Sequence, residues 1–221
     1  SRKLTTERAL DVLRSSDLVL FDTYTSYSCD ITLDWLSSLG INIVPAERKD
    51  LENEYMRIIE KLEKGSKISI ATIGDPVIAT THMALAIEAV KKGHRVRVVP
   101  GVSVLCYFLS KAGLSSYKLG RSVTVTFPDN LPSEYPYRVI KENDSLNLHT
   151  PVFLDIAGKR MMTGKEAVRI LLSLEDKFKE GVVTPDRYVV IGQRLGCDDE
   201  RVDVLRVSEV DNAELAGPPH I

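Results

Sequence analysis

The sequence has few cysteines and lacks the long apolar runs that membrane spans require. Its three cysteines, Cys29, Cys106 and Cys197, lie far apart and form no C-x-x-C pair, so their spacing indicates neither a zinc site nor the disulfide framework of a small secreted domain. No apolar run approaches the roughly 20 residues that cross a bilayer, and no N-terminal stretch resembles a signal peptide. We therefore expect a cytoplasmic protein without a membrane partner.

The sequence also lacks an excess of charge of one sign. It has 29 Lys and Arg against 31 Asp and Glu, a formal net charge of -2, whereas a dedicated nucleic-acid binder shows a basic excess. Neither G-x-G-x-x-G nor G-x-x-x-x-G-K-[ST] occurs, so these two familiar loops hold no nucleotide here. The acidic run at 198–200 resembles a solvated turn more than a metal site. We expect no nucleic-acid partner and no metal.

Hydrophobic periodicity predicts alternating helices and strands in a chain of 221 residues, of which 43% are hydrophobic. The strand, helix and strand over 67–99 predict a βαβ unit and a parallel sheet. The fold class is therefore α/β, and we place two α/β domains at 1–112 and 113–221. Helices are expected near 4–13, 51–64, 83–92 and 165–178, and strands near 18–21, 42–45, 67–73, 95–99, 122–127, 152–156, 188–191 and 201–207.

Three loops that follow predicted strands are candidates for ligand binding, because open α/β sheets bind ligands beyond the carboxyl ends of their strands. They are 74–76, 100–103 and 195–198. In the first, Gly74 permits close backbone approach and Pro76 fixes the next φ, with Asp75 between them. A Gly-Asp-Pro tripeptide alone is typical of an ordinary turn in which Asp75 bonds its own backbone. Thr80 and Thr81 alone indicate no more than a helix cap.

The whole segment Gly74-Asp75-Pro76-Val77-Ile78-Ala79-Thr80-Thr81-His82 is much more specific than its parts. It resembles the diphthine synthases, a branch of the tetrapyrrole methylase family. Other matching segments follow in the same order and cover essentially the whole chain: 23–26 (TYTS), 116–125, 148–150 leading into 153–155, and 217–221 (GPPHI).

This resemblance implies two α/β domains of the tetrapyrrole methylase type, with S-adenosylmethionine folded into the cleft between them. The family's first strand, which touches the cofactor, and its tail find no match in these residues, so we expect one edge of the pocket to be missing. The positions that match the family's cofactor-binding residues are Asp75, Ile78, Ser103, Val104, Leu154, Leu195 and His220.

The resemblance also implies the reaction. Diphthine synthases transfer methyl groups from S-adenosylmethionine, giving S-adenosylhomocysteine, to the amino nitrogen of a 3-amino-3-carboxypropyl-histidine in translation elongation factor 2, and the product is diphthine. A homodimer is implied as well. The sulfonium is an activated donor, so the enzyme needs alignment and exclusion of water rather than a dedicated nucleophile. We assign no catalytic side chain.

Three residues near these motifs invite a stronger role than the sequence supports. His82 and His149 have no neighbouring carboxylate motif, so we interpret His82 as fixing its loop by hydrogen bonding and His149 as a contact at a strand entry. Tyr24 is a candidate for stabilising the trimethylammonium product through its aromatic face, although packing explains it equally well.

Two other functions remain open at this point. One is a related tetrapyrrole methylase that acts on a corrinoid precursor or on ribosomal RNA, although such enzymes are not expected to combine the segments at 24–26, 74–82 and 218–221. The other is a non-catalytic protein that keeps the fold and binds S-adenosylmethionine, because binding residues alone do not establish turnover.

Overall fold

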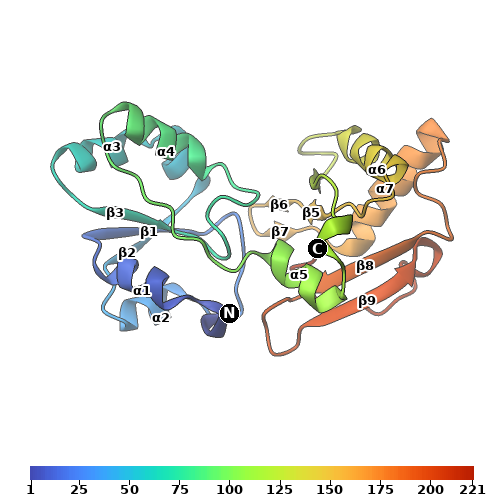
Figure 1. Cartoon of the computed structure of the whole chain (residues 1–221), viewed down its shortest axis with the longest axis horizontal. Coiled ribbons are helices and arrows are strands. Elements are labelled where there is room, and N and C mark those ends of the chain that lie inside the picture. The colour runs from blue at the N-terminus through green and yellow to red at the C-terminus, as the bar shows by residue number, and fades with distance from the viewer. The chain divides into compact units, whose positions relative to one another are not determined.

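The computed structural model describes all of residues 1–221 and divides them into two compact units, Ser1–Ser103 and Val104–Ile221 (Figure 1). Each unit combines helices with a sheet, which confirms the predicted α/β class. The division falls before helix α5 (Val104–Ala112), whereas the sequence placed the boundary after residue 112. Helix α5 belongs to the second unit because its Phe108 ring packs close to Gly192 of that unit.

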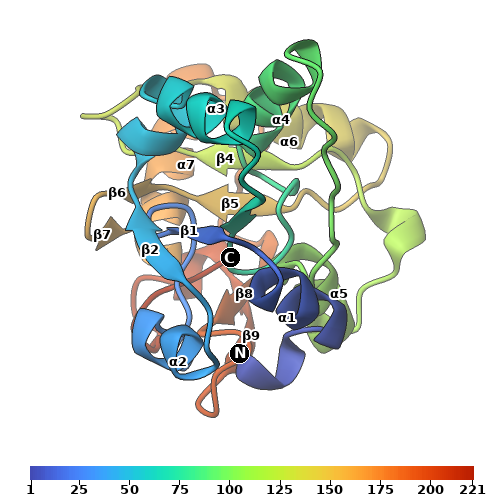
Figure 2. The same cartoon turned by 90° about the vertical axis from the view of Figure 1, so that its left-hand side faces the viewer.

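The first unit contains a parallel three-stranded sheet. Its strands are β1 (Leu18–Asp22), β2 (Ile43–Ala46) and β3 (Ile68–Ala71), in the order β2-β1-β3. Figures 1 and 2 show helices on both sides of this sheet. Helices α1 (Glu7–Arg14) and α2 (Leu33–Ser38) cover one side, and α3 (Met56–Glu63) and α4 (His82–Lys91) cover the other.

The alternation of side chains along β1 produces these three layers, since successive residues of a strand point to opposite faces. Val19 and Phe21 pack in the cluster that contains Leu36 of α2. Leu20 packs against the other cluster, which contains Ile59 of α3. The carboxyl ends of β1 and β3 therefore lie at one edge of a sheet that both layers of helices support.

The strand predicted at 95–99 is wrong, because residues 94–103 have no helix or strand assigned. The alternation of Arg and Val fits a strand, but a strand also needs a pairing partner, and β3 pairs only with β1. Val96 and Val98 are accordingly exposed. The sequence also missed α2, α5 and α6, and the helix expected at 51–64 is split, with a π-helical turn at Lys49–Asn53 before α3.

The second unit contains three strand pairs and two long helices. β4 (Val123–Val125) pairs in parallel with β5 (Val152–Leu154). The antiparallel pairs are β6 (Ile156–Ala157) with β7 (Arg160–Met161), and β8 (Tyr188–Gln193) with β9 (Arg201–Arg206). The helices are α6 (Tyr135–Ser145) and α7 (Gly164–Phe178). 3-10 turns occur at Ser116–Lys118 and Val207–Glu209, and in the first unit at Arg2–Leu4.

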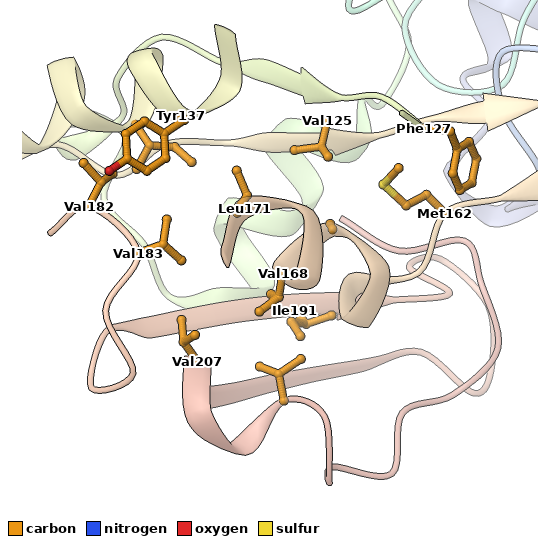
Figure 3. Close-up of a cluster of buried hydrophobic side chains, with 13 residues drawn as sticks. Val125, Phe127, Tyr137, Met162, Val168, Leu171, Val182, Val183, Ile191 and Val207 are labelled. Atoms are coloured by element: carbon orange, nitrogen blue, oxygen red, sulfur yellow. The ribbon is translucent and has the colours of Figure 1, made fainter. Parts of the chain in front are cut away.

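Helix α7 organises the core of this unit. It begins with a capping box in which Thr163 and Glu166 satisfy each other's backbone donors. Figure 3 shows Val168 and Leu171 of α7 between Val125 of β4 and Ile191 of β8, and all four side chains are buried. The parallel pair and the β8–β9 hairpin are thus held on opposite sides of one helix.

None of the helices has both the length and the apolar character that crossing a membrane requires.

Candidate functional site

The loop after β3 is held by the carboxylate of Asp75. One carboxylate oxygen accepts a hydrogen bond from the backbone N–H of Val77 at 2.9 Å, which forms the local turn that the sequence predicts. The other oxygen accepts from the backbone N–H of Gly101 at 3.2 Å. Asp75 therefore ties the loop after β3 to a segment that lies 26 residues further along the chain.

The backbones of these two segments approach closely at Gly74 and Gly101. A Cβ atom built on Gly101 would lie 2.0 Å from the carbonyl oxygen of Gly74, a distance that no side chain tolerates. Gly74 has φ of +93°, which favours glycine, and its own Cβ position lies 3.9 Å from the Cα of Ser103. The structure thus brings together Asp75 and Ser103, which are two of the predicted site residues.

The other predicted residues of this part differ in exposure. Ile78 is 39% exposed and projects from the loop next to Ala79, which has a φ of +55° that side chains rarely adopt. Ser103 is buried, with 6% of its surface exposed. Val104, the first residue of α5, is 39% exposed. These loops therefore offer apolar surface at Ile78 and Val104 and polar groups at Asp75 and Ser103.

In the second unit, His220 is held in one tautomer. Its Nδ1 accepts a hydrogen bond from the backbone N–H of Gly164 at 3.0 Å, so this nitrogen carries no proton. Its Nε2 then carries the proton and donates to the carbonyl oxygen of Ala216 at 2.9 Å. Burial lowers the pKa of His220 from its ordinary value. The ring therefore stays neutral and fixes the C-terminal segment against the first turn of α7.

Leu195 lies beside the same segment. A Cβ atom on Gly192 would lie 2.8 Å from the Leu195 side chain and 2.9 Å from that of Ile221, and Gly192 and Ile221 exchange backbone hydrogen bonds of 2.9 Å. Leu195 and His220 are thus gathered around the end of β8. Leu154 is the last residue of β5 and pairs with Val125 of β4. Leu154, Leu195 and His220 therefore all lie at or close to strand ends.

The sequence missed the carboxylate that accompanies His82. Asp22, the last residue of β1, has a fully buried side chain, and its Oδ2 lies 3.2 Å from Nε2 of His82. Burial by itself favours the neutral carboxyl, but the adjacent His82 ring and the hydrogen bonds from Thr25 and the backbone of Tyr24 outweigh it and lower the pKa of Asp22. Asp22, the residue just before the segment at 23–26, therefore contacts the end of the segment at 74–82.

Tyr24 has neighbours that bear on its predicted role. The Arg48 guanidinium lies 5.0 Å from the centre of its ring, and its hydroxyl donates to Glu52 at 3.3 Å. Burial, together with the negative charges of Asp22 and Glu52, raises the pKa of Tyr24 to about 12. One cation therefore already covers this ring, and the stabilisation of a trimethylammonium product by Tyr24 stays a prediction.

The remaining candidates have partners of their own. Asp199 pairs with Arg194 at 2.7 Å, while Glu200 accepts hydrogen bonds from Tyr107 and from the backbone of Gly196, each at 2.8 Å. The adjacent acids therefore point to different partners. His149 is exposed, and its backbone forms a parallel bridge with Leu119 ahead of β5, a contact at the strand entry as predicted.

Comparison with known proteins identifies the family to which the chain is similar. The family model of the tetrapyrrole (corrin/porphyrin) methylases matches residues 1–211. A diphthine synthase of Saccharolobus islandicus is 48% identical over 225 residues, covering 100% of this chain and 88% of the relative. A diphthine synthase of Metallosphaera sedula is 47% identical over 223 residues with the same coverage.

Solved structures give the same result. A crystal structure of diphthine synthase superposes with a TM-score of 0.88 at 31% identity, covering 100% of this chain and 83% of that one. A conserved hypothetical protein from Aeropyrum pernix superposes with a TM-score of 0.89 at 25% identity, covering 100% and 79%.

Proposed function

This chain belongs to the tetrapyrrole methylase family and is an S-adenosylmethionine-dependent methyltransferase of diphthamide biosynthesis; we propose that its substrate is translation elongation factor 2. The predicted family and enzyme class are thereby confirmed. The acceptor we propose is the amino nitrogen of a 3-amino-3-carboxypropyl-histidine in that factor, with diphthine as the product. The observation that supports it best is the 48% identity to a diphthine synthase over the whole chain.

The loops described above fit S-adenosylmethionine. The ligand has an apolar adenine, a polar ribose and a charged amino-acid end, so its site needs apolar surface with a few convergent polar groups. Ile78 and Val104 supply exposed apolar surface, and the loops after β3 and before α5 approach so closely that their backbone groups are within reach of one ligand. We propose that Asp75, Ile78, Ser103, Val104, Leu154, Leu195 and His220 contribute to binding.

When bound, S-adenosylmethionine supplies an electrophilic methyl group on a positively charged sulfur. The residues of the chain then have to hold the donor in line with the acceptor nitrogen and keep water away, since alignment accounts for much of the rate enhancement of such transfers. The acceptor nitrogen must lose its proton before it attacks, because only the free amine has a lone pair. We assign this deprotonation to no side chain and propose no metal.

The proposed partner is elongation factor 2, without a nucleic acid or a membrane. Homodimer formation and a cytoplasmic location remain predictions from the family resemblance and from the composition.

The proposal is tested by methyl transfer from labelled S-adenosylmethionine to elongation factor 2 that carries the 3-amino-3-carboxypropyl group. We expect the label on the modified histidine, and none on factor that lacks the modification, which is the control. Label on a corrinoid precursor or on ribosomal RNA would contradict the substrate. Binding of S-adenosylmethionine without any transfer would instead indicate a binding protein.

A first variant concerns Asp75. Asp75→Ala removes the hydrogen bond to Val77 within the loop after β3 and the one that joins this loop to Gly101. A hydrogen bond to a charged acceptor is worth about 1.5–3 kcal/mol. We expect calorimetry to show S-adenosylmethionine binding weakened about tenfold or more. Asp75→Asn keeps one oxygen acceptor and should fall between the variant and the wild type. Unaltered affinity in Asp75→Ala would remove this residue from the site.

A further inference from the structure

The carboxylate of Asp22 is the most heavily bonded group at the carboxyl edge of the first unit's sheet. Its Oδ1 accepts from the backbone N–H groups of Tyr24 at 2.9 Å and Thr25 at 3.1 Å. Its Oδ2 accepts from the hydroxyl of Thr25 and, at 3.3 Å, from the hydroxyl of Thr72, which follows β3. Asp22 is thus fixed by the segments that follow β1 and β3.

His82 faces that carboxylate from the first turn of α4. Its side chain is 7% exposed, and Nε2 lies 3.2 Å from Oδ2 of Asp22. The contact is close but poorly directed, so neither ring nitrogen of His82 has a well-aligned hydrogen bond, and both nitrogens are buried. A buried polar ring without good hydrogen bonds costs free energy, and it needs an explanation other than stability.

The start of α4 supplies that explanation. The helix lacks the usual side-chain N-cap, since the hydroxyl of Thr81 donates to Glu52 at 2.7 Å instead of accepting from the helix. The interpretation of Thr80 and Thr81 as ordinary caps is therefore wrong. The hydroxyl of Thr80 reaches back to the carbonyl oxygen of Pro76 at 2.7 Å. Besides this contact within the loop, contacts to other segments, at Glu52 and Asp22, hold its end.

The loop 74–82 is consequently anchored at both ends. At its beginning, Asp75 binds the backbone of Gly101. At its end, Thr81 binds Glu52 and His82 contacts Asp22. Between these anchors, Ile78 is exposed and Ala79 adopts a positive φ. The position of Ile78 therefore depends on the anchors more than on the packing of its own side chain.

We propose that Asp22 and His82 are positioning residues that hold the loop 74–81 in the conformation that binds S-adenosylmethionine. The inference rests on the proposed function, and it gives a structural reason for the segments at 23–26 and 74–82 to occur in one chain. His82 acts through the loop and not on the acceptor amine, because both of its ring nitrogens are buried. Its side chain fixes where α4 begins, and the position of Ile78 follows.

The test compares variants of the whole chain by calorimetry with S-adenosylmethionine and by steady-state methyl transfer. His82→Leu keeps the volume and removes the polar contact, Asp22→Asn removes the charge, and His82→Gln keeps an N–H group for Asp22. The control is His94→Gln, because His94 also has a buried ring nitrogen without a partner but follows the other end of α4.

We expect His82→Leu and Asp22→Asn to raise Kd and KM for S-adenosylmethionine about tenfold, the effect of losing one buried polar contact, with little change in kcat. His82→Gln should restore most of the affinity, and His94→Gln should match the wild type. Wild-type Kd in His82→Leu would overturn the proposal. The proposal would also be overturned if His82→Gln bound S-adenosylmethionine with the wild-type Kd but had a low kcat and lacked one of the pH-dependent phases of the wild-type rate. That result would indicate that His82 accepts a proton in the reaction.

If His82→Leu does not fold by circular dichroism, Asp22→Asn decides the question, and a wild-type Kd in that variant also overturns the proposal. The Kd comparison needs no acceptor. If the wild type binds S-adenosylmethionine but does not methylate elongation factor 2, the proposed substrate is contradicted. The Kd values of these variants can still be compared, so the positioning role is tested independently.

Discussion

Gly101→Ala is expected to lower kcat/KM for S-adenosylmethionine about a hundredfold, the loss that a displacement of about 1 Å in a site can produce. The added methyl group would lie 2.0 Å from the carbonyl oxygen of Gly74, and a backbone atom has no rotamer with which to move away. The two loops must therefore separate, which also lengthens the bond from Gly101 to Asp75. Steady-state methyl transfer measures the loss in kcat/KM, and calorimetry with S-adenosylmethionine measures the accompanying loss of affinity.

A control for Gly101→Ala should lower the stability of the protein without a clash between the loops after β3 and before α5. Gly93→Ala provides it, because Gly93 has φ of +85° and no atom within 4 Å of its Cβ position. We expect this control to lose about 1–2 kcal/mol of stability, the cost of a side chain in the left-handed region, and to bind S-adenosylmethionine normally. Equal affinity in Gly101→Ala and the wild type would mean that the approach of the two loops has no part in binding.

Much of the first unit's sheet could be predicted from the sequence, because each strand is a short apolar segment between helices and its own composition indicates a strand. A similar pattern gave a wrong prediction at 95–99, where Arg and Val alternate as in a strand. Pairing depends on what lies beside a segment, and β3 has β1 as its only neighbour. Helix α6 was missed for another reason. A proline usually interrupts a helix, but Pro136 lies in the first turn, where proline is tolerated.

The candidate site shows a similar limit. The loop after β3 was predictable, since Gly74-Asp75-Pro76 after an apolar strand has few other uses. The contact between His82 and Asp22 was not, because the two residues lie 60 positions apart in the sequence and only parallel pairing of β1 with β3 brings their surroundings to one edge. The signal that would have found it is the acidic residue just before the segment at 23–26.

The second large effect concerns stability and Glu175 near the end of α7. Its carboxylate accepts three backbone N–H groups, of Gly181, Val182 and Val183, at 2.7–2.8 Å, and the hydroxyl of Tyr137 at 2.9 Å. The bond from Val183 is the largest of the influences that lower the pKa of Glu175 to about 2, against the opposing effect of burial. One carboxylate thus closes the turn after α7 over the buried Tyr137 ring.

A depressed folded-state pKa stabilises the protein at pH values above the unfolded pKa of about 4.5, and this stabilisation is lost as the pH falls toward 2. We expect Glu175→Gln to lose about 2 kcal/mol at pH 7, because its amide group cannot accept all four donors. Its unfolding free energy should also change less than that of the wild type between pH 4.5 and 2, as urea titrations would measure. The control is Asp176→Asn, because Asp176 is the next residue and is exposed, and its substitution removes the same charge. Parallel pH profiles for Glu175→Gln and the wild type would show that the turn, and with it the end of α7, is held by the packing of Tyr137, Val182 and Val183 alone.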